Sequence, residues 1–330
     1  MPEKISVFGI GNPLMDFIVN ADDGFIRSLG AEKGTMQLVS AEAKEKLISS
    51  IHSFENIPGG SCANTLRGIA WLSQYDAVDK TVYSGAVGKD AVGNQFISMM
   101  DNEYNIIPLI PQKKKHTGVC IAIITPDYER TMFTHLGACE DYTENDIDFT
   151  RLEKAGILHF TGYMWSIENE KNAIKKASRF CREKGIKISF DLADPLMVKF
   201  HREQFREWIP KYVDILFGNK DEISMITGKE GDNREIVKAA GELAPLVVMK
   251  VGPDGCIVND NGNIHYVRGI KVDAVDTVGA GDSFASGFLY GYIKGKDPKQ
   301  CAQLANRLAA GIVTVVGCDF SKIRQEEILG

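Results

Sequence analysis

The sequence predicts an α/β fold: a mostly parallel central sheet with helices on both faces, plus a small inserted β-sheet that forms a lid. The first observation is that short apolar segments alternate with longer segments of helical periodicity, as in parallel sheets covered by helices. The second is that 44% of the 330 residues are hydrophobic and 25% are charged, an ordinary globular balance. The third is a pair of glycine-rich segments, each of which opens an amphipathic segment. A chain of this length can bury a large core, about 75% of its unfolded surface.

Six segments rich in Val, Ile and Phe predict the strands of the central sheet. They are residues 4–10, 81–86, 157–161, 186–191, 213–217 and 246–251. Apolar residues recur at helical spacing in the segments between them, which are 61–75, 167–184, 199–209 and 233–243. A hairpin around Asn261-Gly262 carries a strong turn signal, and we expect it to extend the main sheet.

Two stretches interrupt this alternation and predict the lid. Residues 118–125 and 130–136 form an expected antiparallel hairpin around Pro126-Asp127-Tyr128-Glu129, and residues 19–40 carry short apolar pieces separated by glycine turns. We therefore expect a large α/β domain and a small β-rich lid. The large domain comprises residues 1–11, 57–104 and 138–330, and the lid comprises residues 12–56 and 105–137. Ligands of open α/β sheets bind beyond the carboxyl ends of the strands, which places the expected site there.

Charge and composition exclude several classes of protein. Lys and Arg total 38 and Asp and Glu total 44, which gives −6 at pH 7. Proteins that coat nucleic acid show a basic excess, so we expect no nucleic-acid partner. The longest apolar runs, 118–124 and 308–316, fall short of the roughly 18 residues of a membrane helix, so we expect no membrane association. The first residues lack a secretory pattern, and seven cysteines without a C-x-x-C pair favour reduced thiols; both predict a cytoplasmic protein.

The most informative segment is DTVGAGDSF at residues 276–284, after which apolar residues recur at helical spacing. Its glycines let N–H groups point toward a ligand, and the helix dipole adds partial positive charge. Gly279, Ala280 and Gly281 therefore predict an anion hole suited to a transferred phosphoryl group. Asp282 at its mouth can accept a proton from an attacking hydroxyl. The alternative is a glycine-rich turn in which Asp282 only caps the helix.

A second segment, Gly59-Gly60-Ser61-Cys62-Ala63-Asn64, precedes another helical run. Paired glycines allow the backbone to approach a ligand closely, and Asn64 projects one turn into the helix. A plain helix start with Ser61 as its cap is the alternative. Two other nucleotide motifs are excluded. Leu14 stands where the dinucleotide fingerprint that begins at Gly9 needs a glycine, and no G-x-x-x-x-G-K-[ST] segment occurs.

DTVGAGDSF and GGSCAN resemble the two signatures of the ribokinase-like (PfkB) carbohydrate and nucleoside kinases, in the same order and on the same elements. The resemblance extends from about residue 7 to residue 320. The chain is most similar to the adenosine kinase branch of that family. The segments that carry this similarity are GNPLMD at 11–16, TGVC at 117–120, VDILFGN at 213–219, the N-x-x-E motif at 219–222 and GCDF at 317–320.

This resemblance implies ATP-dependent phosphorylation of the 5′-hydroxyl of adenosine or a related nucleoside. Asp282 would be the base, with Gly279, Ala280 and Gly281 as the anion hole and Arg130 reaching the phosphates from the lid. The residues implied at the substrate are Asn12, Asp16, Gly59, Gly60, Ser61, Asn64, Cys120, Tyr163 and Met36. Those implied at the ATP side are Asn219, Glu222, Thr277, Gly252 and Asn306. Asn219 and Glu222 would organise Mg²⁺ through water, because Mg²⁺ sheds its water shell reluctantly.

Two departures from the family pattern concern which nucleobase the substrate carries. Met36 stands near the position of a polar residue of adenosine kinases, and the lid strand with Met132 and Thr134 is less apolar than expected. A sugar kinase of the same family, acting on ribose, fructose or a sugar acid, is therefore the first alternative. A nucleoside-binding protein without catalysis is the second. A monovalent cation such as K⁺ beside residues 276–278 and Gly317 is an expectation by family analogy. A monomer and a dimer formed through the lid are both compatible with the sequence.

Overall fold

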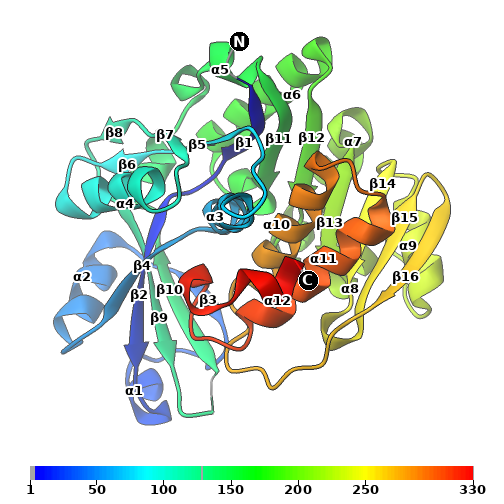
Figure 1. Ribbon diagram of the computed structural model, residues 1–330. Coiled ribbons are helices and arrows are strands. Elements are labelled where there is room, and N and C mark those ends of the chain that lie inside the picture. Colours follow the sequence, from blue (N-terminus) through cyan, green and yellow to red (C-terminus); the bar gives the residue numbers. More distant parts are fainter. Residues whose placement is uncertain (1–3, 128, 330) are drawn as a thin grey trace.

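The computed structural model describes residues 4–127 and 129–329, and its centre is a nine-stranded sheet (Figure 1). The strand order is β16-β15-β14-β13-β12-β11-β1-β5-β7. Every pair from β14 to β7 is parallel, whereas β15 and β16 are added as an antiparallel hairpin at one edge. The strands are β1 (Ile5–Ile10), β5 (Lys80–Ser84), β7 (Ile107–Leu109), β11 (Ala155–Thr161), β12 (Lys187–Asp191), β13 (Ile215–Asn219), β14 (Leu246–Lys250), β15 (Gly255–Asp260) and β16 (Asn263–Arg268).

Helices cover both faces of this sheet, because successive side chains of a strand point to opposite faces (Figure 1). In β14, Leu246 and Val248 join one apolar cluster, while Val247 and Met249 join the other. The first cluster includes residues of α3 (Ser61–Ser73), α4 (Ala91–Asn102), α10 (Ala280–Ile293), α11 (Pro298–Ile312) and α12 (Gln325–Leu329). The second includes residues of α5 (Phe149–Leu152), α6 (Glu168–Lys184), α7 (Pro195–Tyr212), α8 (Lys220–Thr227) and α9 (Asn233–Ala240).

A separate five-stranded sheet, in the order β3-β10-β9-β2-β4, lies beside the large one (Figure 1). Its strands are β2 (Leu14–Asn20), β3 (Met36–Leu38), β4 (Glu55–Gly59), β9 (Gly118–Ile124) and β10 (Arg130–His135). Two helices, α1 (Asp23–Ser28) and α2 (Ala41–Ser49), belong to the same part of the chain. Alternation again assigns the faces: Phe17 packs in the main apolar cluster, whereas Asp16 points into the cavity described below. A short pair, β6 (Val87–Gly88) and β8 (Gln112–Lys113), completes the strands of the described residues.

The predicted fold class is confirmed. All six expected central strands lie in the large sheet, the hairpin around Asn261-Gly262 extends it, and the expected hairpin of the lid forms as β9 and β10. Tyr128, in the turn expected between these two strands, lies outside the described residues. All seven cysteines are free and buried, as the odd count and spacing predict. In the described part of the chain, no helix has the length and apolar character needed to cross a membrane.

Some details differ from the expected boundaries. The range 105–137 was expected in the lid, but β7 within it pairs with β5 in the large sheet. Strand β4, which was not expected, is an edge strand that ends in Pro58 and Gly59. Proline is tolerated in strands only at such edges, so its presence argued against a strand here. Helix α7 begins at Pro195, four residues earlier than expected, because the Asp194 side chain caps it by accepting from the Leu196 N–H at 2.6 Å.

Candidate active site

A cavity of about 320 Å³ is lined by residues of both sheets. The residues from the small sheet and the loops beside it are Asn12, Leu14, Asp16, Met36, Leu38, Cys120, Met132, Thr134 and Leu136. Those near the carboxyl ends of β11, β12 and β14 are Thr161, Tyr163, Ser166, Asp191, Ala193, Met197 and Lys250. The first turns of α3 and α10, with the residues before them, add Gly60, Ser61, Cys62, Asn64, Val278, Gly279, Gly281 and Asp282. The site thus lies at the carboxyl ends of the parallel strands, as predicted.

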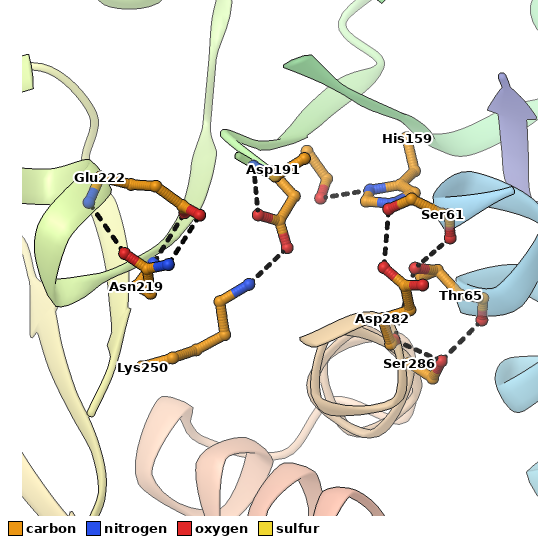
Figure 2. Close-up of polar contacts among 11 residues, drawn as sticks. Ser61, Thr65, His159, Asp191, Asn219, Glu222, Lys250, Asp282 and Ser286 are labelled. Atoms are coloured by element: carbon orange, nitrogen blue, oxygen red, sulfur yellow. Dashed lines mark hydrogen bonds and ion pairs between the residues drawn. The ribbon is translucent and has the colours of Figure 1, made fainter. Parts of the chain in front are cut away.

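Asp282 lies in the first turn of α10 and faces the first turn of α3 (Figure 2). Its Oδ1 accepts a hydrogen bond from the Ser61 hydroxyl at 2.6 Å, and its Oδ2 accepts one from Asn64 Nδ2 at 2.9 Å. Burial raises the pKa of the Asp282 carboxyl above its usual range, and the bonds from Ser61 and Asn64 oppose part of that rise. Asp282 thus does more than cap a helix, because both of its oxygens are aligned by another helix at the edge of the cavity.

Asp16 is the second carboxyl group of the cavity, and the two glycines of the GGSCAN segment make room for it and for the chain beside it. A Cβ atom placed on Gly59 would lie 2.2 Å from Asp16 Oδ1, and one on Gly60 would lie 2.2 Å from the Asn12 carbonyl oxygen. Gly60 also has φ +91°, which disfavours any side chain. Burial raises the pKa of Asp16 to about 7, against the opposing charges of Arg130 and Arg67.

The expected anion hole lies at the start of α10, where a glycine in a left-handed conformation precedes the helix. Gly279 has φ +73°, and no side chain caps the helix N-terminus. A Cβ on Gly279 would lie 2.6 Å from Cys318 Sγ, so only glycine fits between the helix and the loop of Cys318. The Ala280 N–H donates to the Thr277 carbonyl oxygen at 3.2 Å. The N–H groups of Gly279 and Gly281 are therefore the two through which the expected anion hole would act.

Lys250 is a residue of the cavity that the sequence analysis missed. It is the last residue of β14, and the β14 alternation places it on the face that α10 covers. Its Nζ donates to Asp191 Oδ2 at 2.8 Å (Figure 2). The same Nζ lies 3.3 Å from a Cβ placed on Gly281. Burial opposes its charged form, yet the Asp191 and Glu222 carboxylates raise its pKa. A lysine that ends an apolar strand of a parallel sheet is the sequence signal that could have identified it.

Asn219 and Glu222 form a reciprocal cap at the start of α8 (Figure 2). The Asn219 N–H and Nδ2 each donate to one oxygen of Glu222 at 2.8 Å, and the Glu222 N–H donates to Asn219 Oδ1 at 2.8 Å. Both Glu222 oxygens are thus engaged, and burial raises the pKa of that carboxyl. Among the described residues, no three His, Cys, Asp or Glu side chains are grouped as direct metal ligands. Because their side chains already bond each other, Asn219 and Glu222 fit a cation held through water better than one bound directly.

Several residues expected at the ATP side do not line the cavity. The Asn306 amide donates to the carbonyl oxygens of Val267 and Arg268, at 3.3 and 3.0 Å, and thus holds the edge strand β16. Gly252 and Thr277 are exposed at the surface. A nucleotide-binding role for these three residues stays a prediction.

Arg130 is buried and forms an ion pair with Asp276. Asp276 Oδ2 also accepts from the Gly317 N–H at 2.7 Å, so the carboxylate beside the expected cation region is already balanced by a guanidinium. A cation at this place and contact of Arg130 with a phosphate stay predictions.

At the other end of the cavity, Asn12 Nδ2 donates to Glu170 Oε2 at 3.4 Å. Glu170 is fully buried, and burial raises its pKa to about 8. Glu170 was not expected at the site, because the residues of α6 have the pattern of an ordinary amphipathic helix there.

Tyr163, Cys120 and Met36 all line the cavity as expected. The Tyr163 hydroxyl donates to Asp194 Oδ2 at 3.5 Å, so the residue is fixed at its polar end.

The comparisons with known proteins identify the family of this chain. Residues 30–325 match the model of the pfkB family carbohydrate kinases. Adenosine kinase 2 of Arabidopsis thaliana is 25% identical over 336 residues, which cover 95% of each chain. A probable sugar kinase from Rhizobium etli CFN 42 has a solved structure with a TM-score of 0.88 and 29% identity, over 96% of this chain and 95% of the other. The solved structure of adenosine kinase from Sinorhizobium meliloti has a TM-score of 0.86 and 29% identity, again over 96% of this chain and 95% of the other.

The fold and the family match therefore define a kinase of the ribokinase-like type, with a cavity lined by residues of both sheets. The chain belongs to the pfkB family of carbohydrate kinases. It is accordingly an enzyme that transfers a phosphoryl group to an alcohol, within a family that acts on sugars and nucleosides.

Proposed function

We propose that this kinase transfers the γ-phosphoryl group of ATP to the 5′-hydroxyl of adenosine or a related nucleoside. The observation that carries the proposal is that two chemically different sets of side chains line the cavity. Asp16, Asn64 and Asp282 supply carboxylate and amide groups, and Met36, Leu38 and Met132 supply apolar side chains from the small sheet. A nucleoside has the same division between ribose and base, whereas a free sugar is polar on every side.

The proposed mechanism begins with binding of the sugar hydroxyls. Asp16 can engage two hydroxyls, because a carboxylate has two acceptor oxygens. Asn64 can donate its second Nδ2 hydrogen to a hydroxyl, since its first bonds Asp282 and its oxygen accepts from Arg67. The 5′-hydroxyl would then lie beside Asp282, which Ser61 and Asn64 hold in place. Asp282 accepts the hydroxyl proton as the oxygen attacks the phosphorus. The proton moves to Asp282, and the bond between the β,γ-bridging oxygen and the γ-phosphorus breaks, which leaves ADP.

Charge that develops on the transferred group would be stabilised by the N–H groups of Gly279 and Gly281 and by the Lys250 ammonium. This assignment is supported by the uncapped start of α10 and by the position of Lys250 Nζ, 3.3 Å from a Cβ placed on Gly281. Such donors are already in place when the charge appears, which is why they lower the barrier. We propose that Asn219 and Glu222 hold Mg²⁺ through water, where it would neutralise phosphate charge.

A sugar substrate is the second candidate, favoured by the solved probable sugar kinase of Rhizobium etli. The experiment that separates the two measures ADP release with Mg·ATP against adenosine, inosine, guanosine, cytidine, ribose and fructose. The Asp282→Asn variant is the blank, since loss of a general base costs about 10²–10⁴-fold in rate. Preference for adenosine supports the proposal. Preference for a free sugar overturns the nucleoside assignment but leaves Asp282 as the proposed catalytic base. Turnover in Asp282→Asn equal to that of the wild type contradicts the assignment of the base.

A further inference from the structure

Arg67, on α3, is a buried cation whose hydrogen bonds all reach neutral acceptors. The side chain is 1% exposed. One terminal nitrogen donates to the Pro58 carbonyl oxygen at 2.5 Å and to Asn64 Oδ1 at 3.0 Å. The other donates to the Tyr104 hydroxyl at 2.9 Å and to the Cys318 carbonyl oxygen at 3.0 Å. A guanidinium stays charged in a protein and is costly to bury without an anion, so its position calls for an explanation.

The bond to Asn64 determines which end of that amide faces Asp282. An amide side chain has one acceptor oxygen and one donor nitrogen. Because Asn64 Oδ1 accepts from Arg67, Asn64 Nδ2 is the atom left to donate to Asp282 Oδ2, at 2.9 Å. A reversed amide would place its oxygen against the carboxylate, and the two acceptors would repel each other. Arg67 therefore selects the orientation in which Asn64 stabilises ionised Asp282.

The charge of Arg67 acts on the other carboxyl group of the cavity. Burial raises the pKa of Asp16, and the positive charges of Arg130 and then Arg67 oppose that rise. Arg130 is already paired with Asp276, whereas Arg67 has only neutral partners in its hydrogen bonds. Its charge thus remains available to the ionised carboxylates of the cavity through a medium of low dielectric.

The same guanidinium joins the two glycine segments. Pro58 immediately precedes Gly59 and Gly60, and its carbonyl oxygen is one acceptor. Cys318 supplies another, and this residue packs so closely on Gly279 that a Cβ there would lie 2.6 Å from Cys318 Sγ. Arg67 is thus bonded to the end of strand β4, beside Asp16, and to the loop of Cys318 that packs on Gly279.

We propose that Arg67 is a positioning residue for phosphoryl transfer: it holds the Asn64 amide with its donor toward Asp282, and its buried charge acts on the Asp16 carboxyl group. The proposal deepens the kinase function above and rests on it for the catalytic consequence. Arg67 itself touches neither the expected substrate nor the transferred group, since it acts through Asn64 and through its charge.

Two substitutions separate the two roles. Arg67→Lys keeps the charge and loses the planar set of donors, whereas Arg67→Gln keeps an N–H₂ donor and loses the charge. Arg206→Gln is the matched control, because Arg206 also donates to backbone carbonyl oxygens, those of Ile226 and Thr227, but does not line the cavity. Circular dichroism and thermal unfolding establish that each variant is folded.

The measurements are the pH profile of kcat/KM and the titration of the aspartate side-chain carbons by ¹³C NMR, assigned with Asp16→Asn and Asp282→Asn. We expect Arg67→Gln to move the Asp16 midpoint upward by about one pH unit, the effect of removing a nearby opposite charge. We expect Arg67→Lys to leave the midpoints in place and to lower kcat by about 10²-fold, the cost of a misplaced supporting group. Arg206→Gln should change neither.

The outcomes are distinguishable. An unmoved Asp16 midpoint in folded Arg67→Gln, or wild-type kcat in Arg67→Lys, overturns the proposal. Lower thermal stability alone, without a shifted midpoint or a lower kcat, indicates a purely structural role and also overturns it. If Arg67→Gln does not fold, the kcat of Arg67→Lys decides. A wild-type protein inactive across the substrate panel overturns the proposed function instead, and the NMR titration still shows whether Arg67 acts on the Asp16 carboxyl group.

Discussion

The Ser61 hydroxyl donates a hydrogen bond to Asp282 Oδ1 at 2.6 Å, across 221 residues of sequence. Each residue lies in the first turn of its helix, and the two helices pack against each other in the same apolar cluster. The contact joins the GGSCAN and DTVGAGDSF segments into one site. A hydrogen bond to a carboxylate favours its charged form, so the Ser61 hydroxyl lowers the pH at which Asp282 becomes ionised.

Replacing Ser61 by Ala should therefore raise the pKa of Asp282 further. Burial already raises this pKa, and the Ser61 bond opposes the rise. A general base must be deprotonated to act, so activity rises with pH through this pKa, and its acidic limb should move to higher pH in Ser61→Ala. The measurement is the pH profile of kcat. Ser73→Ala, on the same helix with its hydroxyl bonded to the Ile69 carbonyl oxygen, is the control and should keep the wild-type midpoint.

Substitutions of Lys250 and Asp191 should separate the contribution of this ion pair to stability from its contribution to catalysis. Lys250→Met leaves the Asp191 carboxylate buried without its partner, which costs about 3–5 kcal/mol of unfolding free energy. The double variant Lys250→Met/Asp191→Asn removes both charges and should recover most of that stability. If Lys250 serves the transferred phosphoryl group, kcat/KM for ATP should stay low in the double variant. Thermal unfolding and ATP titrations check both parts, and recovery of both would restrict Lys250 to a structural role.

Alanine at Gly279 should reduce kinase activity more than alanine at Gly295, a glycine with the same backbone conformation. Gly279 and Gly295 have φ +73° and +72°, so alanine is strained at both, by about 1–2 kcal/mol. Only at Gly279 does the added Cβ meet a neighbour, Cys318; at Gly295 nothing lies within 4 Å. We expect Gly295→Ala to keep kinase activity and Gly279→Ala to lose most of it as the anion hole is displaced. Equal activity in the two variants would contradict the assignment of the anion hole.

Met132 should distinguish a nucleoside from a free sugar. It lies on β10 beside Met36 of β3, and both side chains line the cavity. Met132→Ser removes apolar contact area and should raise the KM for adenosine by roughly tenfold, the effect of losing about 1.5 kcal/mol of burial. The KM for ATP should not change. Met225→Ser, on α8 away from the cavity, is the control. An unchanged adenosine KM would indicate that the base does not contact this part of the small sheet.

The parts of the fold that the sequence predicted are those encoded locally. The parallel strands are continuous apolar runs, and the helices after Gly60 and Gly279 begin at glycines and continue at helical spacing, so each could be read from its own residues. Asp282, Asn64 and Asp16 were predicted for the same reason, since each lies in or beside a segment whose composition is distinctive. By contrast, β4 and β7 are short segments that become strands only through their neighbours in the sheet.

The pairings that give the site its chemistry were decided only by the tertiary structure. Lys250 and Asp191 lie 59 residues apart, Arg130 and Asp276 lie 146 apart, and Arg67 reaches Cys318 across 251 residues. No local pattern encodes such contacts, because they depend on the order of strands in the sheet and on which face each strand end presents. The sequence by itself therefore determined the class of fold and the two glycine segments, and it predicted Asp282 as the base. The packing of the two sheets decided which charges meet there, because a charge is buried only where a partner or a polar network compensates it.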